Sequence, residues 1–511
     1  MKRRDFLKFA SSLSATRVMP VGLSMGLLAE RAHAFSPNYS QLTIAAPTVL
    51  PQVINIFMYG GASELAGNLS NMTDININSV NDYSANNAFR STILDAATDN
   101  DPANRSRFSD GQITANNFWK EAGGTHMEDM LASGDMAVYR TIMKKKSPTR
   151  SHRESIFMSH KGTLDIESSP GIGSRLALMI KENESTFQNV VTADGSVLGA
   201  LDEAVLPFVS FEGESQTFAL DPNNTLPLAL QGLTMDQNFN NPYTRGVGRD
   251  SNHHGSSADA ILALLQSRQS AMNDNVAKYQ KAADGFTKRE ELEQNMDNLS
   301  ALLDADLPDG VTYPNTNFAT QLRSAVTLAI HNPQTMYIAV GTPGLGGWDD
   351  HNNGIDEYPD RMNDVMEAIK SAMAHINASS GAATLKDGSL RNRTDNIVIN
   401  VMGDFGRLVN LNNSGGWDHA NNQNLYTFGG SGVRPTKEAA ALGSVIGTTM
   451  REGTSKTNNQ YTVPTTDSVT FEPMSIASSI YGYFGATNSS IMTADPEFNP
   501  DGDLRLEDIL L

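Results

Sequence analysis

The chain has 511 residues, a formal net charge of −19 and no cysteine. A surface this acidic repels nucleic acid and anionic lipid, so we expect no nucleic-acid partner. Without cysteine, disulfides and thiol chemistry are excluded, and stability must come from a hydrophobic core, which a chain of this length can bury easily. A small anionic substrate remains compatible with the charge, because a metal ion or arginine can reverse the field inside one cleft.

The N-terminus predicts export. Paired arginines, Arg3 and Arg4, precede a weakly apolar stretch from Val18 to Leu28, and a small-residue cleavage site follows at residues 32–34. This order predicts a twin-arginine signal over residues 1–34, with a retained anchor as the alternative. The apolar stretch is far shorter than the roughly 20 residues of a membrane span, so we expect no integral membrane segment after cleavage and a periplasmic or extracellular location.

Alternating strands and helices predict the fold. The apolar, β-rich run 51–59 indicates a buried strand that ends at Gly60. By the same criteria we expect strands at 189–191, 205–211, 335–340, 396–402 and 425–428, and helices at 174–181, 318–330, 358–376 and 474–484. Strands that alternate with helices imply right-handed crossovers, and so an α/β fold with a mainly parallel, doubly wound sheet and helices on both faces.

The simplest organisation is a single domain over residues 35–511 with two insertions. Residues 62–150 are rich in Asn, Asp and Ser and predict long loops or a polar elaboration. Residues 256–307 carry apolar positions at helical spacing and predict one or two amphipathic helices. Ligands of such sheets bind beyond the carboxyl ends of the strands, so the segments after Tyr59, Val340 and Met402 should form the functional edge.

A short motif that occurs twice is the most informative feature. Gly346-Gly347-Trp348-Asp349-Asp350-His351 is echoed by Gly415-Gly416-Trp417-Asp418-His419. Each copy places a carboxylate and an imidazole close together in a glycine-rich loop, a ligand combination that suits zinc, manganese or iron. The ordinary alternative is a loop carboxylate that caps a turn beside a histidine bonded to backbone.

Three further residues have side chains suited to catalysis. Asp404 follows the strand 396–402 directly and could point into a cleft, although an N-cap role is equally compatible. Arg407 could hold an anionic group in a bidentate grip, or pair with a surface carboxylate. Ser151, in Thr149-Arg150-Ser151-His152, offers a hydroxyl that could be a nucleophile, or could simply be solvated.

These motifs together resemble a known family. A Gly-Gly loop after the first strand, then Arg-Ser-His, Trp-Asp-x-His, Asp-Phe-Gly-Arg and Trp-Asp-His, is similar to the domain of unknown function 1501 family, of the alkaline-phosphatase-like (sulfatase-like) superfamily. The resemblance covers roughly Val53 to Phe428. It implies an alkaline-phosphatase-like fold whose sheet edge holds one or two divalent metal ions, zinc, manganese or calcium. It suggests Asp349, His351 and His419 as ligands of one metal, Asp404 as a ligand of the second, and Ser151 in the place of the nucleophile.

The sequence departs from the family pattern at two positions. The first-strand loop usually contains Gly-Gly-Ala-Asp-Gly, whereas this chain has Gly61-Ala62-Ser63-Glu64, so a carboxylate is lost or replaced by Glu64. The family's Glu-Phe-Gly-Arg appears here with Asp404 in the first place. A two-metal site with a missing carboxylate could hold one ion or none.

Two functions follow as hypotheses. The first is an exported metal-dependent hydrolase of phosphate or sulfate esters, in which Arg407 steadies a small anionic ester substrate. The second is a non-catalytic periplasmic scaffold or partner-binding protein that keeps the fold. Near the C-terminus, residues 497–508 imitate a calcium loop but lack its first Asp and last Glu, so a turn rich in Asp and Asn is the better interpretation.

Overall fold

The structure is a computed structural model. It describes residues 39–70, 112–221, 226–239, 263–264, 267, 294–342, 347–379, 392–411, 416–450 and 463–510. The expected signal, residues 1–34, and most of the expected helical insertion lie outside these ranges, although residues 294–304 of that insertion are helical. Within the described ranges, no helix combines the length and apolar character needed to cross a membrane.

The described residues form one large mixed sheet. Its order is β10-β2-β9-β6-β1-β5-β3-β4, and β9 alone among these strands runs antiparallel to its neighbours. The strands are β1 (Gln52–Met58), β2 (Met136–Met143), β3 (Phe208–Ser210), β4 (Leu233–Thr234), β5 (Tyr337–Gly341), β6 (Ile397–Gly403), β9 (Asn422–Gly429) and β10 (Val445–Ile446). Two small sheets pair β7 (Gly406–Leu411) with β8 (Trp417–Ala420) and β11 (Thr449–Met450) with β12 (Val463–Pro464).

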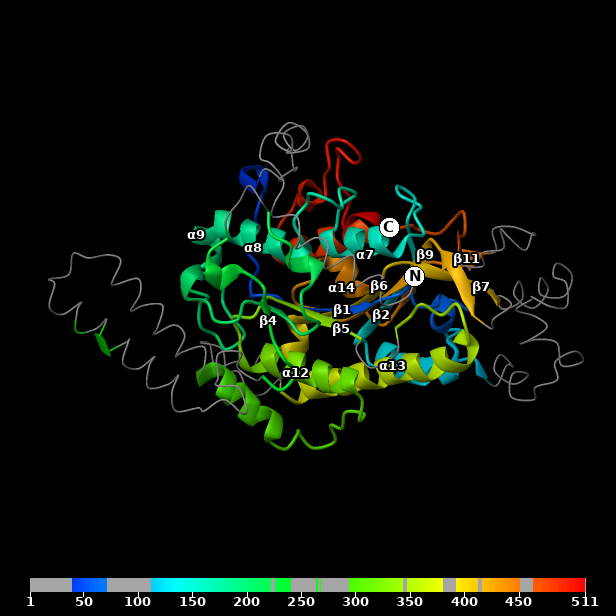
Figure 1. The fold of residues 1–511 in the computed structure, drawn as a ribbon, viewed down its shortest axis with the longest axis horizontal. Helices are drawn as coiled ribbons and strands as arrows, with labels where there is room; N and C mark the ends of the chain where they lie inside the picture. The colour runs from blue at the N-terminus through cyan, green and yellow to red at the C-terminus, as the bar shows by residue number, and fades with distance from the viewer. Residues whose placement is uncertain are drawn as a thin grey trace, which may run out of the picture.

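Helices cover both faces of the sheet (Figure 1), which confirms the expected α/β class. They are α6 (Thr125–Ala132), α7 (His152–Lys161), α8 (Ile172–Glu182), α9 (Glu184–Phe187), α12 (Asn317–His331), α13 (Gly354–Ala378), α14 (Thr436–Ala440), α15 (Pro473–Tyr483) and α16 (Leu506–Ile509). Successive side chains of β1 point to opposite faces. Ile54 and Ile56 join the core under α12 and α13, whereas Val53 and Phe57 join the core under α8 and α15.

Two expectations from the sequence differ from the structure. The end of the expected polar insertion, residues 136–143, is the buried strand β2 of the main sheet. Its sequence MAVYRTIM is apolar except at Arg140 and Thr141. These two polar residues interrupt the apolar run, so the segment was not predicted as a strand. Residues 189–191 form no strand, because Val191 makes only an isolated bridge to Val197.

The topology assembles one functional edge. Strands β6, β1 and β5 are adjacent and parallel, so their carboxyl ends open onto the same side of the sheet. The segments that begin at Tyr59, Thr342 and Asp404 therefore meet there. Helix α7, which starts at His152, brings the Arg-Ser-His segment to the same edge, where the His152 ring packs 4.7 Å from that of Phe405.

Candidate metal centre

The two copies of the doubled motif meet at this edge, the first in the loop after β5 and the second in strand β8 rather than in the expected loop. His351 Nε2 and His419 Nε2 lie 2.8 Å apart, although 68 residues separate them along the chain. Backbone hydrogen bonds fix this approach, because Trp417 N donates to Asp350 O at 2.7 Å and Trp348 N donates to Tyr59 O at 2.9 Å. The convergence expected from the doubled motif is therefore present.

Tryptophans anchor both loops to one aromatic ring. Trp348 and Trp417 contact the Tyr358 ring edge-on, with centroids 5.9 and 5.8 Å away, and Trp119 stacks near it at 6.3 Å. These are all three tryptophans of the chain, and each is fully buried. The tryptophan of each motif copy thus packs into the core below the site, which leaves the Asp and His beside it free to face the edge.

Glycine permits the close approach of the first loop to strand β1. Gly60 has φ +116°, which disfavours other residues, and a Cβ there would collide with the backbone of Trp348 and Asp349. The β7–β8 hairpin then places Arg407 directly opposite His419 in its register. Cross-strand partners share a face of a hairpin, so both side chains reach the same point.

Four side chains surround this point. Measured from Asp349 Oδ1, the Nε2 atoms of His152, His351 and His419 lie at 3.2, 3.2 and 3.6 Å. The ligand atoms of these four residues all fall within 4.8 Å of one another. Ligand atoms bound tetrahedrally at ~2.0–2.1 Å from a zinc ion would lie about 3.4 Å apart. The three distances from Asp349 Oδ1 are close to this value, whereas the 2.8 Å between His351 Nε2 and His419 Nε2 is shorter.

The Nδ1 atoms of the three histidines, which face away from the cluster, support the interpretation as a site for one ion. His152 Nδ1 lies 2.7 Å from Asp404 Oδ2, His419 Nδ1 lies 2.8 Å from Arg150 O, and His351 Nδ1 lies 3.3 Å from Asp418 Oδ1. Oxygen acceptors at Nδ1 favour the proton there and leave the Nε2 lone pair for a cation, the usual arrangement around metal-binding histidines. His152 Nε2 is buried and makes no well-aligned hydrogen bond within the described residues. The residues present therefore fit a divalent metal.

Charge at the cluster follows from these contacts. Partial burial works to raise the pKa of Asp349, but polar contacts with His152, His419 and Arg407 hold it well below its usual range. The carboxylates of Asp349 and Asp404 raise the pKa of His152 to about 9. Burial and the Arg407 charge lower the pKa of His351. Asp349 and His351 are thus in the forms that bind a cation, whereas His152 carries a proton at neutral pH in the metal-free protein and gives it up when a cation binds.

Asp404 lies outside the four-residue cluster. Its side chain is fully buried, Oδ1 accepts a hydrogen bond from Gly60 N at 3.1 Å, and Oδ2 contacts the His152 ring. Each oxygen thus contacts one protein group, and Asp404 is not among the four clustered residues. The assignment of Asp404 to a second metal stays a prediction.

Arg407 is buried and fully engaged. Its guanidinium donates to the carbonyl oxygens of Gly61 at 2.7 Å, Trp417 at 2.9 Å and Trp348 at 3.1 Å, and also to Gly60 O. Nη2 forms an ion pair with Asp349 Oδ1 at 2.8 Å, and Nη1 lies 3.4 Å from His351 Nε2. The five N–H groups of an arginine are therefore directed at the three loops of the site rather than outward.

His152 is the cluster residue that the sequence did not single out. In Thr149-Arg150-Ser151-His152, the side chain suited to catalysis was the hydroxyl of Ser151, which is exposed and precedes the first residue of α7. The Arg-Ser-His motif contained the signal, but the carboxylate nearest to it in sequence, Glu154, bonds to Thr149, and the local sequence did not reveal that Asp404 lies beside His152. Arg150 contributes its carbonyl to the site, and its side chain is exposed.

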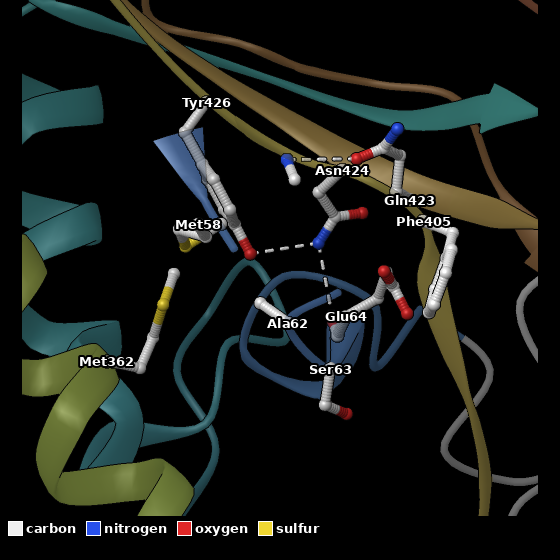
Figure 2. A pocket seen from close by; sticks show the side chains of 10 residues that line it. Met58, Ala62, Ser63, Glu64, Met362, Phe405, Gln423, Asn424 and Tyr426 are labelled. Atoms are coloured by element: carbon white, nitrogen blue, oxygen red, sulfur yellow. Dashed lines mark hydrogen bonds between the residues drawn. The ribbon is translucent and has the colours of Figure 1, made fainter. Parts of the chain in front are cut away.

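Glu64 lines a small internal cavity (Figure 2). Its carboxylate accepts a hydrogen bond from Arg407 N at 2.8 Å, and burial raises its pKa well above the usual range. Its backbone carbonyl accepts from Asn424 Nδ2 at 3.3 Å, and the cavity is also lined by Phe405 and Tyr426. Glu64 is not among the four clustered residues, so it does not replace the missing first-strand carboxylate as a ligand of that group.

The calcium-like loop is closed by a lysine. Lys146 Nζ lies 2.8 Å from Asp503 Oδ1 and 3.1 Å from Asn499 Oδ1. Asp495 Oδ1 accepts hydrogen bonds from the backbone N–H groups of Glu497 and Phe498, as in an Asp-initiated turn. An ammonium group therefore neutralises the oxygen-rich loop.

The fold and the cluster together define an α/β protein with a candidate metal centre at the carboxyl edge of its sheet. A family model described as "Protein of unknown function (DUF1501)" matches residues 51–476. The chain therefore belongs to this family, which confirms the resemblance of its motifs at the family level. No curated protein matches the chain. Among solved structures, one titled "Crystal structure of Ps i-CgsB" is similar at 10% identity and a TM-score of 0.34, covering 89% of this chain and 77% of that chain.

Proposed function

We propose that this protein is an exported, metal-dependent hydrolase of phosphate or sulfate esters with an alkaline-phosphatase-like fold. The observation that carries the proposal is the convergence of Asp349, His351, His419 and His152 on one point, with an oxygen acceptor behind each imidazole. The proposed periplasmic or extracellular location depends on the sequence of residues 1–34.

These four residues would hold a divalent cation, which acts as a Lewis acid and draws charge from an ester oxygen. Asp349 keeps 55% of its side chain exposed and His351 keeps 37%, so the cluster opens to solvent on their side. A substrate can therefore reach the ligands without rearrangement of the core.

The charge around the cluster favours an anionic ester. Five basic residues of this acidic chain fall within one short segment, at Lys144, Lys145, Lys146, Arg150 and Arg153. Arg153 pairs with Glu167 and Lys146 with Asp503, whereas the exposed Arg150 guanidinium has no ion pair within the described residues. Because its carbonyl contacts His419 Nδ1, Arg150 is the best-placed basic residue to bind the ester's anionic group. Since Arg407 is bound to backbone carbonyls, we assign it to holding the loops.

Ser151 is the candidate nucleophile. It is exposed and adjacent to His152, and among the described contacts its hydroxyl bonds to no side chain or backbone group. Its oxygen would attack the phosphorus or sulfur, the ester alcohol would leave, and water would then release the anion and restore the hydroxyl.

The test is turnover of aryl phosphate and aryl sulfate esters by the mature protein, before and after metal removal. We expect turnover that chelation abolishes, that added metal restores, and that His351→Ala removes. His331→Ala is a matched control, because His331 ends helix α12 away from the cluster. No turnover with any divalent metal would contradict the hydrolase proposal.

One observation favours the second candidate, a non-catalytic scaffold or partner-binding protein. Four protein ligands can complete a tetrahedral shell, which is typical of structural rather than catalytic zinc. A stoichiometric periplasmic partner recovered with metal-loaded protein that lacks turnover would favour this function.

A further inference from the structure

The superfamily pattern places a second cation at Asp404, and the surroundings of Asp404 argue against one. Its two carboxylate oxygens contact Gly60 N and His152 Nδ1. Metal ions of a two-metal site lie ~3.5–4 Å apart, and here the His152 imidazole stands between Asp404 and Asp349 of the cluster.

Other groups reinforce this conclusion. Glu64, the carboxylate nearest to the family's first-strand position, accepts from Arg407 N instead of facing the cluster. The ammonium of Lys144 lies 4.9 Å from the centre of the Phe405 ring, beside Asp404, and is held by Thr149 O at 2.6 Å and Ser155 Oγ at 2.7 Å. A buried positive charge beside Asp404 repels a second cation.

We infer that the centre takes one divalent cation, that His152 is its fourth ligand, and that Asp404 is a positioning residue which holds the His152 ring. This inference deepens the metal site of the proposed function and rests on it. His152 Nε2 lies 3.2 Å from Asp349 Oδ1, within the spacing of the other ligand atoms, and Asp404 fixes the opposite ring nitrogen at 2.7 Å. The imidazole thus fills the space between the cluster and Asp404.

The experiment is a titration of metal-free mature protein with Zn²⁺, followed by calorimetry and by elemental analysis after desalting. We expect one ion per chain. Asp404→Asn should still bind one ion with affinity about 10–100-fold weaker, because loss of an outer acceptor loosens a ligand without removing it. His152→Ala should weaken the same single site further. Asp129→Asn is the matched control, since Asp129 is an exposed carboxylate paired with Lys370, and it should change nothing.

Co²⁺ substitution gives a readout independent of turnover. The wild-type protein should show the intense visible absorption of four-coordinate cobalt, and His152→Ala should shift it while thermal unfolding shows that the variant is folded. The inference would be overturned if the wild-type chain bound two ions and Asp404→Asn lost one of them while the other kept its affinity. This result would leave the proposed hydrolase standing. Unchanged affinity in His152→Ala would also overturn the inference. One ion without turnover would contradict only the hydrolase, and no bound ion would contradict both.

Discussion

Replacement of Arg407 by alanine distinguishes a structural arginine from a substrate-binding one. The side chain is fully buried and holds four backbone carbonyls and the Asp349 carboxylate. Removal of one partner of a buried ion pair costs about 3–5 kcal/mol. Because Asp349 is half exposed, the broken Arg407–Asp349 ion pair costs less than this. Each backbone carbonyl that loses its donor and that water does not reach adds about 1–3 kcal/mol to the loss of stability. We therefore expect a loss of about 3–5 kcal/mol.

Thermal unfolding of the metal-free protein measures this loss without interference from ligand binding. With an unfolding entropy of about 2.1 cal/mol/K per residue, a 4 kcal/mol loss lowers Tm by on the order of 4 °C for a chain of this size. Arg407→Lys keeps the charge but offers fewer donors, so its Tm should lie between those of the wild type and Arg407→Ala. Arg150→Ala is the control and should stay within about 0.5 kcal/mol of wild type, since Arg150 is exposed. An Arg407→Ala protein as stable as wild type, yet unable to bind inorganic phosphate when metal-loaded, would refute the structural role of this arginine.

Three further predictions concern stability and ion binding. Tyr358→Ala should destabilise the protein by about 3–5 kcal/mol, because three tryptophans pack on the Tyr358 ring. Tyr358→Phe keeps the ring and loses only the hydrogen bond to Ser63 O, so it should cost about 1 kcal/mol. Equal losses of the two variants in denaturant unfolding would contradict this prediction. Burial lowers the pKa of His160 to about 3, so the folded state resists protonation of this residue and the stability of the protein should fall as the pH drops from 6.5 towards 3. The effect of His160→Leu on stability should therefore be more favourable at pH 5 than at pH 7.5 by about 2 kcal/mol. Identical pH profiles of Tm for the wild type and His160→Leu would disprove the link. In protein whose four-residue centre is already loaded with zinc, Lys146→Met should let calcium raise Tm through the loop at Asp503, with no calcium effect on the wild type. Equal calcium stabilisation of both zinc-loaded proteins would count against the lysine as the closing group.

Much of the fold could be predicted because its central strands are strongly apolar. Residues 51–59 and 396–402 became β1 and β6, and the helices at 318–330 and 358–376 were shifted by only a few residues at their ends. Strand β2 was missed because Arg140 breaks its apolar pattern. Its guanidinium is buried and reaches the carbonyls of Gly67 and Asn116, contacts that depend on the tertiary structure and leave no trace in local sequence.

The site was half predictable. The doubled motif brought His351 and His419 together as expected: the first copy follows β5, the second lies in the β7–β8 hairpin that follows β6, and β5 and β6 end at the same edge. The roles of Asp404 and Arg407 could not be predicted, since a carboxylate or guanidinium after a strand can face a ligand or the protein with the same local sequence. His152 gains its role only from Asp404, 252 residues away along the chain.

X-ray absorption spectroscopy of the zinc-loaded mature protein tests the proposed metal centre most directly. We expect a single ion with scattering from three imidazoles and one carboxylate, reduced to two imidazoles in His419→Ala. An ion bound by fewer than three histidines in the wild type, or a spectrum unchanged in His419→Ala, would contradict the four-residue centre.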